Sequence, residues 1–411
     1  MKMPFMHMMD HYAGVPLTFL CSLYLRIKHR FKPAPKQLPD PVRNILCIEL
    51  SEMGSMIHLT LLLDKMKETY PEANIYFATF RSSAPILRIL NRVDPDKILT
   101  VRSNSFFVFT FDCFRLLFKL ARTPFDITFD FELFSRISSL ICFFSGAPVK
   151  VGFDNFKGEG LYRGNFLTHP VIYNHHHHIV KNFLGMWYAL QEPWDDIPHS
   201  KRYIEDDAVR LPRFTFDKQL VETFRERLYH VYPVLKNASK LVLLNPNSSK
   251  ELPLRRWPLA SYLALTQQLI TTPGLYVAVT GGPEERADAA FICGQMGHPQ
   301  VVDLSGFTSM AELIALYHFA DLMVSNDSGP AQFSALAQMK TITLFGPETP
   351  DLYGALNPNA HNIHKRLQCS PCYTAENHRR SACTNNLCMQ LITVDEVYGK
   401  AQKMLYASEI P

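Results

Sequence analysis

The sequence lacks several features that would place it in a protein class at once. Its 411 residues contain no internal repeat and no low-complexity tract, which excludes repeat proteins and long tails of biased composition. The 42 basic and 38 acidic residues leave a net charge of only +4, so the strong basic field of a nucleic-acid-binding protein is also missing. A chain of this length exceeds one ordinary hydrophobic core and therefore predicts two domains.

A hydrophobic run long enough to span a bilayer is missing as well. The apolar stretch at residues 15–25 is shorter than the roughly 20 residues that a membrane span needs. No small-residue cleavage site follows it, and its basic residues lie on the wrong side for a signal peptide. We expect residues 1–42 to form a helix in the membrane interface and a linker; a helix packed on the protein or on another copy is the alternative. The cations that would face an anionic cytoplasmic membrane surface are Arg26, Lys28, Arg30, Lys32 and Lys36.

What the sequence does contain is two series of short apolar strands that alternate with amphipathic helices. The first series, in residues 43–205, places strands at 44–50, 74–80, 97–101, 125–131 and 149–153. The second, in residues 206–393, places strands at 240–245, 275–281, 301–304, 321–325 and 341–345. This alternation predicts an α/β protein with two doubly wound, Rossmann-like domains, whose ligands bind at the carboxyl ends of the strands. We expect residues 394–411 to form a helix that crosses back to the first domain.

Four strand ends of the second series carry small, hydroxyl-bearing or charged residues. They lie at 245–249 (Asn-Pro-Asn-Ser-Ser), 280–285 (Thr-Gly-Gly-Pro-Glu-Glu), 325–330 (Ser-Asn-Asp-Ser-Gly-Pro) and 345–350 (Phe-Gly-Pro-Glu-Thr-Pro). Taken alone, the Asp327-Ser328 turn also suits an ordinary helix cap. Because the carboxyl ends of parallel strands share one edge of a sheet, the four turns together predict a ligand site there.

These turns carry the resemblance to a known family. An Asp-Ser-Gly turn at 327–329, the Phe-Gly-Pro-x-x-Pro segment at 345–350 and the Cys-x-Pro-Cys segment at 369–372 resemble glycosyltransferase family 9, which includes the ADP-heptose:lipopolysaccharide heptosyltransferases. The first domain agrees in its Glu-Met-Gly-Ser turn at 52–55 and in Val-Gly-Phe at 151–153. The resemblance implies a GT-B fold and inverting transfer of a sugar from a nucleotide diphosphate donor, ADP-linked by preference, without a metal at the reaction centre.

The resemblance also implies a donor site in the second domain. A fixed guanidinium at Arg255 would stabilise the charge on the departing diphosphate, although a solvated basic turn is the alternative. Glu284, or its neighbour Glu285, is placed to accept hydrogen bonds from a ribose. Gln332 stands where the family usually has a histidine, so the chain departs from the pattern there. The implied donor-binding residues are Ser248, Ser249, Arg255, Glu284, Asp327, Ser328, Gly329 and Gln332.

The catalytic base is a second departure. The family's usual aspartate directly follows the first-domain glycine, where this sequence has Ser55. Inverting transfer needs a base for the acceptor hydroxyl, and a serine without a partner is no such base. Glu52 in the same turn is our replacement candidate, with Asp130 and its neighbour Glu132 as second choices. For Glu52, a structural carboxylate bonded to turn amides is the alternative.

Two further clusters of metal-ligating residue types stand out. The four consecutive histidines at 175–178 cannot all face one point on a helix, so no metal site is predicted there. Shortly before them, Arg163 is a candidate contact for an anionic acceptor. Cys369, Cys372, Cys383 and Cys388 have the spacing of a closed, structural thiolate site for Zn or Fe, with free thiols as the alternative.

We therefore expect an inverting glycosyltransferase on the cytoplasmic, inner-membrane surface. It would move heptose or a related sugar to a lipopolysaccharide-type or other membrane-associated acceptor, with no nucleic-acid partner. The alternatives are a non-catalytic relative that acts as a scaffold, and a nucleotide-sugar epimerase or hydrolase on the same fold.

Overall fold

A computed structural model describes residues 3–31, 37–156, 158, 161–212, 214–249, 252–375 and 377–406. The chain forms two compact units. The first runs to Arg210 and takes in His378, and the second runs from Leu211 to Thr374 and resumes at Arg379. The chain thus passes from the first unit to the second between Arg210 and Leu211, whereas the sequence analysis sets the boundary at residue 205.

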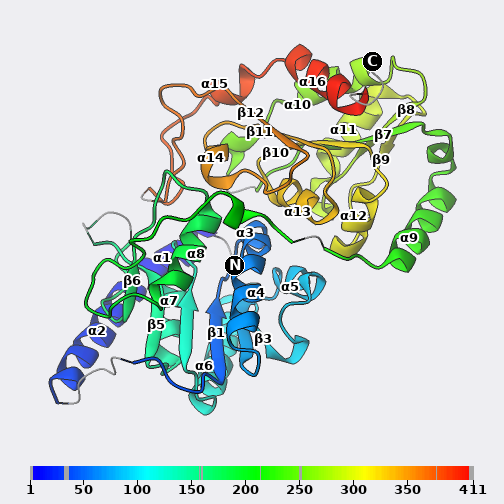
Figure 1. Ribbon diagram of the computed structural model, residues 1–411. Helices are drawn as coiled ribbons and strands as arrows, with labels where there is room; N and C mark the ends of the chain where they lie inside the picture. Colours follow the sequence, from blue (N-terminus) through cyan, green and yellow to red (C-terminus); the bar gives the residue numbers. More distant parts are fainter. Residues whose placement is uncertain are drawn as a thin grey trace. The chain divides into compact units, whose positions relative to one another are not determined.

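The first unit is built on a six-stranded parallel sheet in the order β3-β2-β1-β4-β5-β6 (Figure 1, blue to green). The sequence predicts every strand except β6, which is only three residues long and reads His-Pro-Val. Two neighbours in the centre, β1 and β4, bring the turn after Ile48 beside Asp130. The strands are β1 (Asn44–Ile48), β2 (Asn74–Phe80), β3 (Ile98–Val101), β4 (Ile127–Asp130), β5 (Val149–Phe153) and β6 (His169–Val171).

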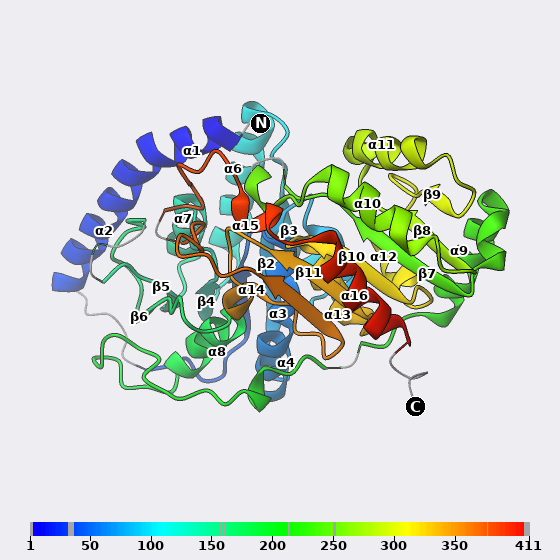
Figure 2. The ribbon, with the colours of Figure 1, turned by 90° about the horizontal axis from the view of Figure 1, so that it is seen from above.

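Helices cover both faces of this sheet (Figure 2). One face carries α3 (Met53–His58), α4 (Thr60–Thr69), α5 (Ala84–Leu90) and α8 (Ile179–Ala189). The other carries α1 (Met3–Tyr12), α2 (Gly14–Phe31), α6 (Phe106–Arg122) and α7 (Arg136–Phe144), with α7 in contact with each of the other three. Apolar side chains of β1, α6 and α7 form a core cluster on that side.

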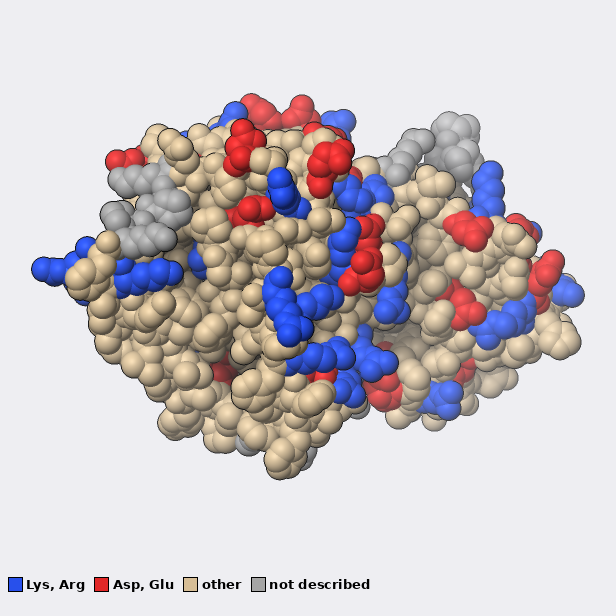
Figure 3. Space-filling view, turned by 90° about the horizontal axis from the view of Figure 1, so that it is seen from below, with Lys and Arg blue, Asp and Glu red and all other residues tan. Residues whose placement is uncertain are grey.

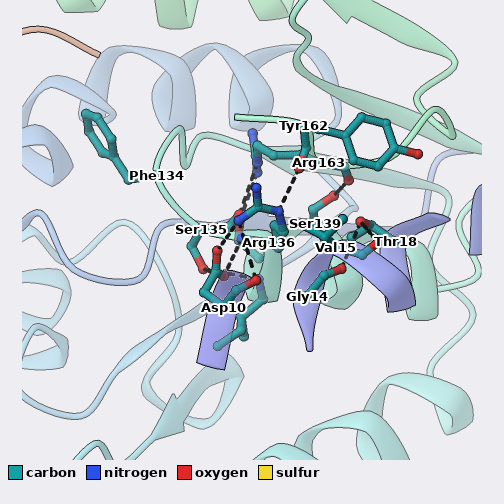
Figure 4. A network of polar contacts seen from close by, with 12 residues as sticks. Asp10, Gly14, Val15, Thr18, Phe134, Ser135, Arg136, Ser139, Tyr162 and Arg163 are labelled. Carbon is teal, nitrogen blue, oxygen red and sulfur yellow. Dashed lines mark hydrogen bonds and ion pairs between the residues drawn. The ribbon is translucent and has the colours of Figure 1, made fainter. Parts of the chain in front are cut away.

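The N-terminal helices α1 and α2, which follow one another end to end through Ala13, are held to α7 by a buried polar network (Figure 4). Asp10 accepts a hydrogen bond from the backbone N–H of Arg136 at 2.7 Å, and its other carboxylate oxygen lies 2.8 Å from the Arg136 guanidinium. Gly14 allows the close approach, because a Cβ there would lie 2.9 Å from the Cβ of Arg136. Helices α1 and α2 are thus packed on the protein. In the described part of the chain, no helix is long and apolar enough to cross a membrane; Lys32 and Lys36 lie outside it.

The second unit repeats the architecture with a six-stranded parallel sheet in the order β12-β11-β10-β7-β8-β9. The strands are β7 (Lys240–Asn245), β8 (Leu275–Val279), β9 (Val301–Asp303), β10 (Leu322–Asn326), β11 (Thr341–Phe345) and β12 (Ala360–His364). Its helices are α9 (Lys218–Val231), α10 (Leu259–Leu269), α11 (Arg286–Met296), α12 (Met310–Tyr317), α13 (Gly329–Ala337), α14 (Pro350–Tyr353), α15 (Leu387–Gln390) and α16 (Val394–Tyr406). Single 3-10 turns lie at Pro95–Lys97, Asp207–Val209, Pro233–Asn237, Pro253–Arg255 and Pro283–Glu285. The two sheets confirm the predicted fold class.

The C-terminal helix corrects one expectation. Instead of crossing to the first unit, α16 packs on α10 within the second. Its apolar side, Val397, Ala401 and Leu405, joins the core cluster under β7, β10 and β11. Lys340 also donates a hydrogen bond to the carbonyl of Met404 at 2.7 Å. This apolar side is therefore satisfied locally, which the amphipathic pattern alone does not specify.

Candidate active site

Carboxylates gather where β1 and β4 end in the first unit. Glu49 follows β1 and is buried, and its Oε1 accepts a hydrogen bond from the backbone N–H of Glu52 at 3.3 Å. Glu52 precedes α3, and its carbonyl accepts a hydrogen bond from the Ser55 hydroxyl at 2.8 Å. Ser55 is thus bound to the turn, and the carboxylate of Glu52 belongs to a group that includes Glu49. Glu49 was not predicted as a site residue, because its position in the sequence belongs to an apolar strand.

Glu132 is the carboxylate whose acidity is best suited to proton transfer. It is buried, and its two oxygens accept hydrogen bonds from the backbone N–H groups of Leu50 and Phe134, each at 3.4 Å. Burial, followed by the negative charge of Glu52, raises the pKa of Glu132 to about 7. Burial together with Glu132 and Glu52 raises the pKa of Glu49 well above its usual value. A base that titrates near neutral pH is the kind that general-base catalysis favours.

Asp130 lies in a different environment, although it is only two residues away. Its carboxylate forms a buried ion pair with Arg163 and accepts a hydrogen bond from the Ser138 hydroxyl at 3.4 Å. The Arg163 guanidinium is itself fixed, because it donates to the carbonyl of Ser135 at 3.0 Å and to the Ser138 hydroxyl at 2.8 Å. Arg163, which the sequence analysis offers as a contact for an anionic acceptor, is thus engaged with Asp130. Burial raises the pKa of Asp130 even against this guanidinium.

The histidine run contributes local structure. His178 accepts a hydrogen bond from the backbone N–H of Val180 at 3.3 Å and so caps α8. Its ring also packs edge-on against the ring of buried His58, with 5.0 Å between the centroids. His176 and His177 are exposed.

In the second unit, Asn326 at the end of β10 holds the site together. Its side-chain oxygen accepts hydrogen bonds from the backbone N–H of Trp257 at 3.0 Å and from the Tyr262 hydroxyl at 3.1 Å. Its amide nitrogen donates to the carbonyls of Pro246 at 2.9 Å and Asn247 at 3.1 Å. One fully buried amide therefore joins the turn after β7, the Arg-Trp-Pro segment at 256–258 and the Asp-Ser-Gly turn.

Arg255 lies among buried carboxylates at this edge. Its guanidinium is 2.5 Å from Glu348 and 3.5 Å from the carboxylate of Asp327. Burial disfavours the charge of Arg255, but the two carboxylates outweigh it and raise the pKa of the guanidinium. Arg379 pairs with the other oxygen of Glu348 at 2.7 Å. The structure thus brings Arg255 and Asp327 together, and it adds Glu348 and Arg379, which were not predicted as site residues, to the same cluster.

Other predicted donor-site residues lie around this cluster. Ser248 is buried, with its hydroxyl 3.4 Å from the carbonyl of Leu252, and Ser249 is exposed. Ser328 precedes α13, and its hydroxyl lies 3.1 Å from that of Ser325. Gln332 is buried in the first turns of α13 and donates to the carbonyl of Tyr353 at 2.6 Å.

The two glutamates after β8 differ in their contacts. Glu285 accepts a hydrogen bond from the backbone N–H of Gly282 at 2.7 Å, so it closes its own turn. Glu284 is exposed. Of the pair, Glu284 therefore remains the better candidate to bind a ribose.

The four-cysteine segment does not fit the predicted metal site. The described residues include no group of three or more His, Cys, Asp or Glu side chains placed to hold a metal ion. Cys369 and Cys383 are exposed, whereas Cys388 is buried against Gly346. The segment instead supports the turn that carries Glu348, because the backbone N–H of Cys372 donates to the carbonyl of Pro347 at 2.9 Å. A structural Zn or Fe is therefore unsupported.

Comparisons with known proteins agree with this geometry. Lipooligosaccharide heptosyltransferase 2 of Campylobacter jejuni is 25% identical over 179 residues, which is 43% of this chain and 54% of that protein, so the match spans about half of the relative's length. The Haemophilus influenzae lipooligosaccharide heptosyltransferase 2 is 25% identical over 330 residues, 77% of this chain and 87% of that protein.

Solved structures share the fold over nearly the whole chain. The E. coli ADP-heptose lipopolysaccharide heptosyltransferase II superimposes with a TM-score of 0.68 at 18% identity, covering 89% of this chain and all of that one. The E. coli heptosyltransferase WaaC with ADP gives a TM-score of 0.59 at 16% identity over 88% of this chain and 99% of that one. These likenesses establish the GT-B fold. The family model for glycosyltransferase family 9 (heptosyltransferase) matches residues 113–382, and the chain therefore belongs to glycosyltransferase family 9.

Proposed function

We propose that the protein is an inverting glycosyltransferase that moves heptose or a related sugar from an ADP-linked donor to a lipopolysaccharide-type acceptor. The observation that carries this proposal is the buried cluster of Arg255, Asp327, Glu348 and Arg379 at the edge of the second sheet, in a chain of this family. Related structures were solved with ADP and with ADP-2-deoxy-2-fluoro heptose.

In the donor site, Arg255 binds the diphosphate and stabilises its charge as the bond to the sugar breaks. Glu348 and Asp327 hold the guanidinium in place before the donor arrives. The Asp-Ser-Gly turn at the start of α13 offers backbone N–H groups to the same phosphates. Ser248, Ser249, Glu284 and Gln332 line the rest of the nucleotide-sugar site.

In the first unit, Glu132 is the stronger of the candidate bases. Transfer forms a bond between the acceptor oxygen and the anomeric carbon while the bond to the diphosphate breaks, and the base takes the proton of the hydroxyl. Glu132 has a pKa near 7, whereas Asp130 is held in an ion pair with Arg163. We assign Glu52 to the same carboxylate group, where its charge helps to raise the pKa of Glu132.

The acceptor class suggests where the protein works. A lipid-linked acceptor is reached at the cytoplasmic face of the inner membrane, and α2 carries an exposed apolar side together with the cations Arg26, Lys28 and Arg30. We propose that the protein binds this surface peripherally, with the apolar side of α2 in the membrane interface. No nucleic-acid partner is proposed.

The test is transfer by the purified chain. ADP should bind in calorimetry, and radiolabelled sugar from ADP-heptose should pass to a heptose-deficient lipopolysaccharide acceptor. Arg255→Ala should abolish ADP binding, whereas Arg225→Ala, at an arginine on α9 that pairs with Glu222, should leave it unchanged. Failure to bind ADP or any other nucleotide diphosphate would sink the proposal.

The two alternatives give different results in the same assay. Turnover of the donor without an acceptor would favour an epimerase or hydrolase, and binding without any turnover would favour the scaffold. Glu132→Gln and Glu52→Gln then assign the base. Loss of transfer by more than about 100-fold, within the range of general-base effects, is expected only for the first. If only Glu52→Gln loses transfer, the sequence-based choice is right.

A further inference from the structure

Helix α6 carries a stripe of phenylalanines that the rest of the first unit leaves uncovered. Spacings of four, three and four residues place the stripe on a single side of the helix. The opposite side, with Leu116 and Leu120, packs into the core, so the helix has two apolar faces. The stripe consists of Phe107, Phe111, Phe114 and Phe118, which are 84%, 64%, 68% and 57% exposed.

The exposed charges of α6 itself are of one sign. Asp112 is the only acidic residue of α6, and it is buried and bonded to Arg102 through both carboxylate oxygens, at 2.8 and 2.9 Å. The exposed cations of the helix are Arg115, Lys119 and Arg122, the last with its guanidinium 3.7 Å from the centre of the Phe118 ring. An apolar stripe on a helix whose exposed charges are all cations matches an anionic lipid surface, with apolar chains below and negative headgroups around.

The stripe continues a surface that α2 begins. Both helices pack against α7 on the same side of the sheet, and Phe144 of α7 is itself 45% exposed. Figure 3, seen from below, shows a broad area with few charged side chains over this part of the first unit. The exposed apolar residues that α2 adds are Leu17, Phe19, Leu20, Leu23, Tyr24, Ile27 and Phe31.

We propose that α6 and α2 together form one membrane-docking face, in which the phenylalanine stripe of α6 enters the interface of an anionic bilayer beside α2. The proposal deepens the proposed function, on which it rests for the choice of a membrane. Two helices on either side of α7 fix how the first unit sits on the bilayer, whereas a single helix would leave it free to rotate about that helix.

Vesicle binding without any donor tests this face. The full-length protein should float with vesicles that contain phosphatidylglycerol, and Phe111→Ser with Phe114→Ser should lower the partition coefficient by more than tenfold, because two rings no longer enter the interface. Phe291→Ser on α11, where the ring is 42% exposed, is the matched control and should leave it unchanged. Neutralising Arg115 and Lys119 should weaken binding about fivefold per cation on anionic vesicles and not on neutral ones.

Several outcomes would overturn the proposal. Unchanged binding of the Phe111/Phe114 variant would remove α6 from the face. A wild-type dimer in sedimentation that the same variant dissociates, without any vesicle binding, would make the stripe a contact between copies of this chain. ADP affinity is measured in parallel on the wild type and on each variant. If the wild type does not bind ADP, the proposed function fails, whereas loss of vesicle binding alone concerns only the docking face.

Discussion

Removing Asp10 should detach the N-terminal helices α1 and α2 from the rest of the first unit. The Arg136 side chain is only 5% exposed, and Asp10 accepts hydrogen bonds from both its guanidinium and its backbone N–H. Asp10→Ala would leave a buried guanidinium without its carboxylate, and breaking a buried pair in this way costs about 3–5 kcal/mol. Arg136 keeps its hydrogen bond to the carbonyl of Tyr162 at 2.8 Å, which places the expected loss near the lower end, about 3 kcal/mol.

Hydrogen exchange is the suitable assay, because a protein of two units need not unfold in one step. A loss of about 3 kcal/mol corresponds to a roughly 100-fold increase in exchange of the α1 and α2 amides. Asp96→Ala, at an exposed aspartate of the same unit, is the matched control and should leave exchange unchanged.

A double-mutant cycle separates the ion pair from simple loss of packing. Arg136→Met removes the buried charge and keeps much of the volume, so the Asp10→Ala/Arg136→Met variant should recover about 2 kcal/mol relative to Asp10→Ala alone. If the double variant is no more stable than the single one, the buried ion pair does not hold α1 and α2 on the first unit.

Two further predictions concern the candidate site. The raised pKa of Glu132 means that the folded protein binds its proton more tightly than the unfolded chain, so stability should fall as pH rises from about 4.5 to about 7. Glu132→Gln should reduce this slope in urea titrations, and the raised pKa of Glu49 accounts for part of what remains. Because the base must be unprotonated, the wild-type transfer rate should rise with pH around a midpoint near 7; a rate independent of pH between 5 and 8 would exclude Glu132. Asn326→Ala should lower stability by about 3 kcal/mol and weaken ADP binding, because four buried hydrogen bonds lose their partner. A loss below about 1 kcal/mol in urea unfolding would contradict that role.

Much of the fold follows from the sequence because its strands are buried on both faces. Such strands appear as continuous apolar runs between helices, so ten of the strands were predicted close to their bounds. The strands that were missed, β6 and β12, lie at the edges of their sheets and read His-Pro-Val and Ala-His-Asn-Ile-His, without such a run. The partner of α16 could not be predicted either, since an amphipathic pattern shows that a helix packs and not where.

The candidate site was predictable where a motif encodes it and not where tertiary contact creates it. Arg255 and Asp327 stand in recognisable turns, and the structure brings them together. Glu49 and Arg379 carry no local signal, since their roles depend on neighbours distant in the sequence. The environment of Asp130 also escaped prediction, because its partner Arg163 arrives from a loop 33 residues later. Spacing likewise suggested a metal for the four cysteines. Spacing alone, however, does not show whether four thiols come together in space, and among the described residues they form no such group.

The contacts of α7 connect α1 and α2 to the carboxylates of the first unit. Asp10 binds the backbone at Arg136, in the first turn of α7, and Arg163 binds the carbonyl of Ser135 directly before it. Ser138, one turn further on, bonds to both Arg163 and Asp130. In the proposed docking, a displacement of α1 and α2 would therefore act on the helix end that positions Arg163 and Asp130. Because the backbone N–H of Glu132 donates to Asp130 at 3.3 Å, the candidate base lies one hydrogen bond from this network. The segment that binds Asp10 thus also positions Arg163 and Asp130, whose charges contribute to the pKa of Glu132.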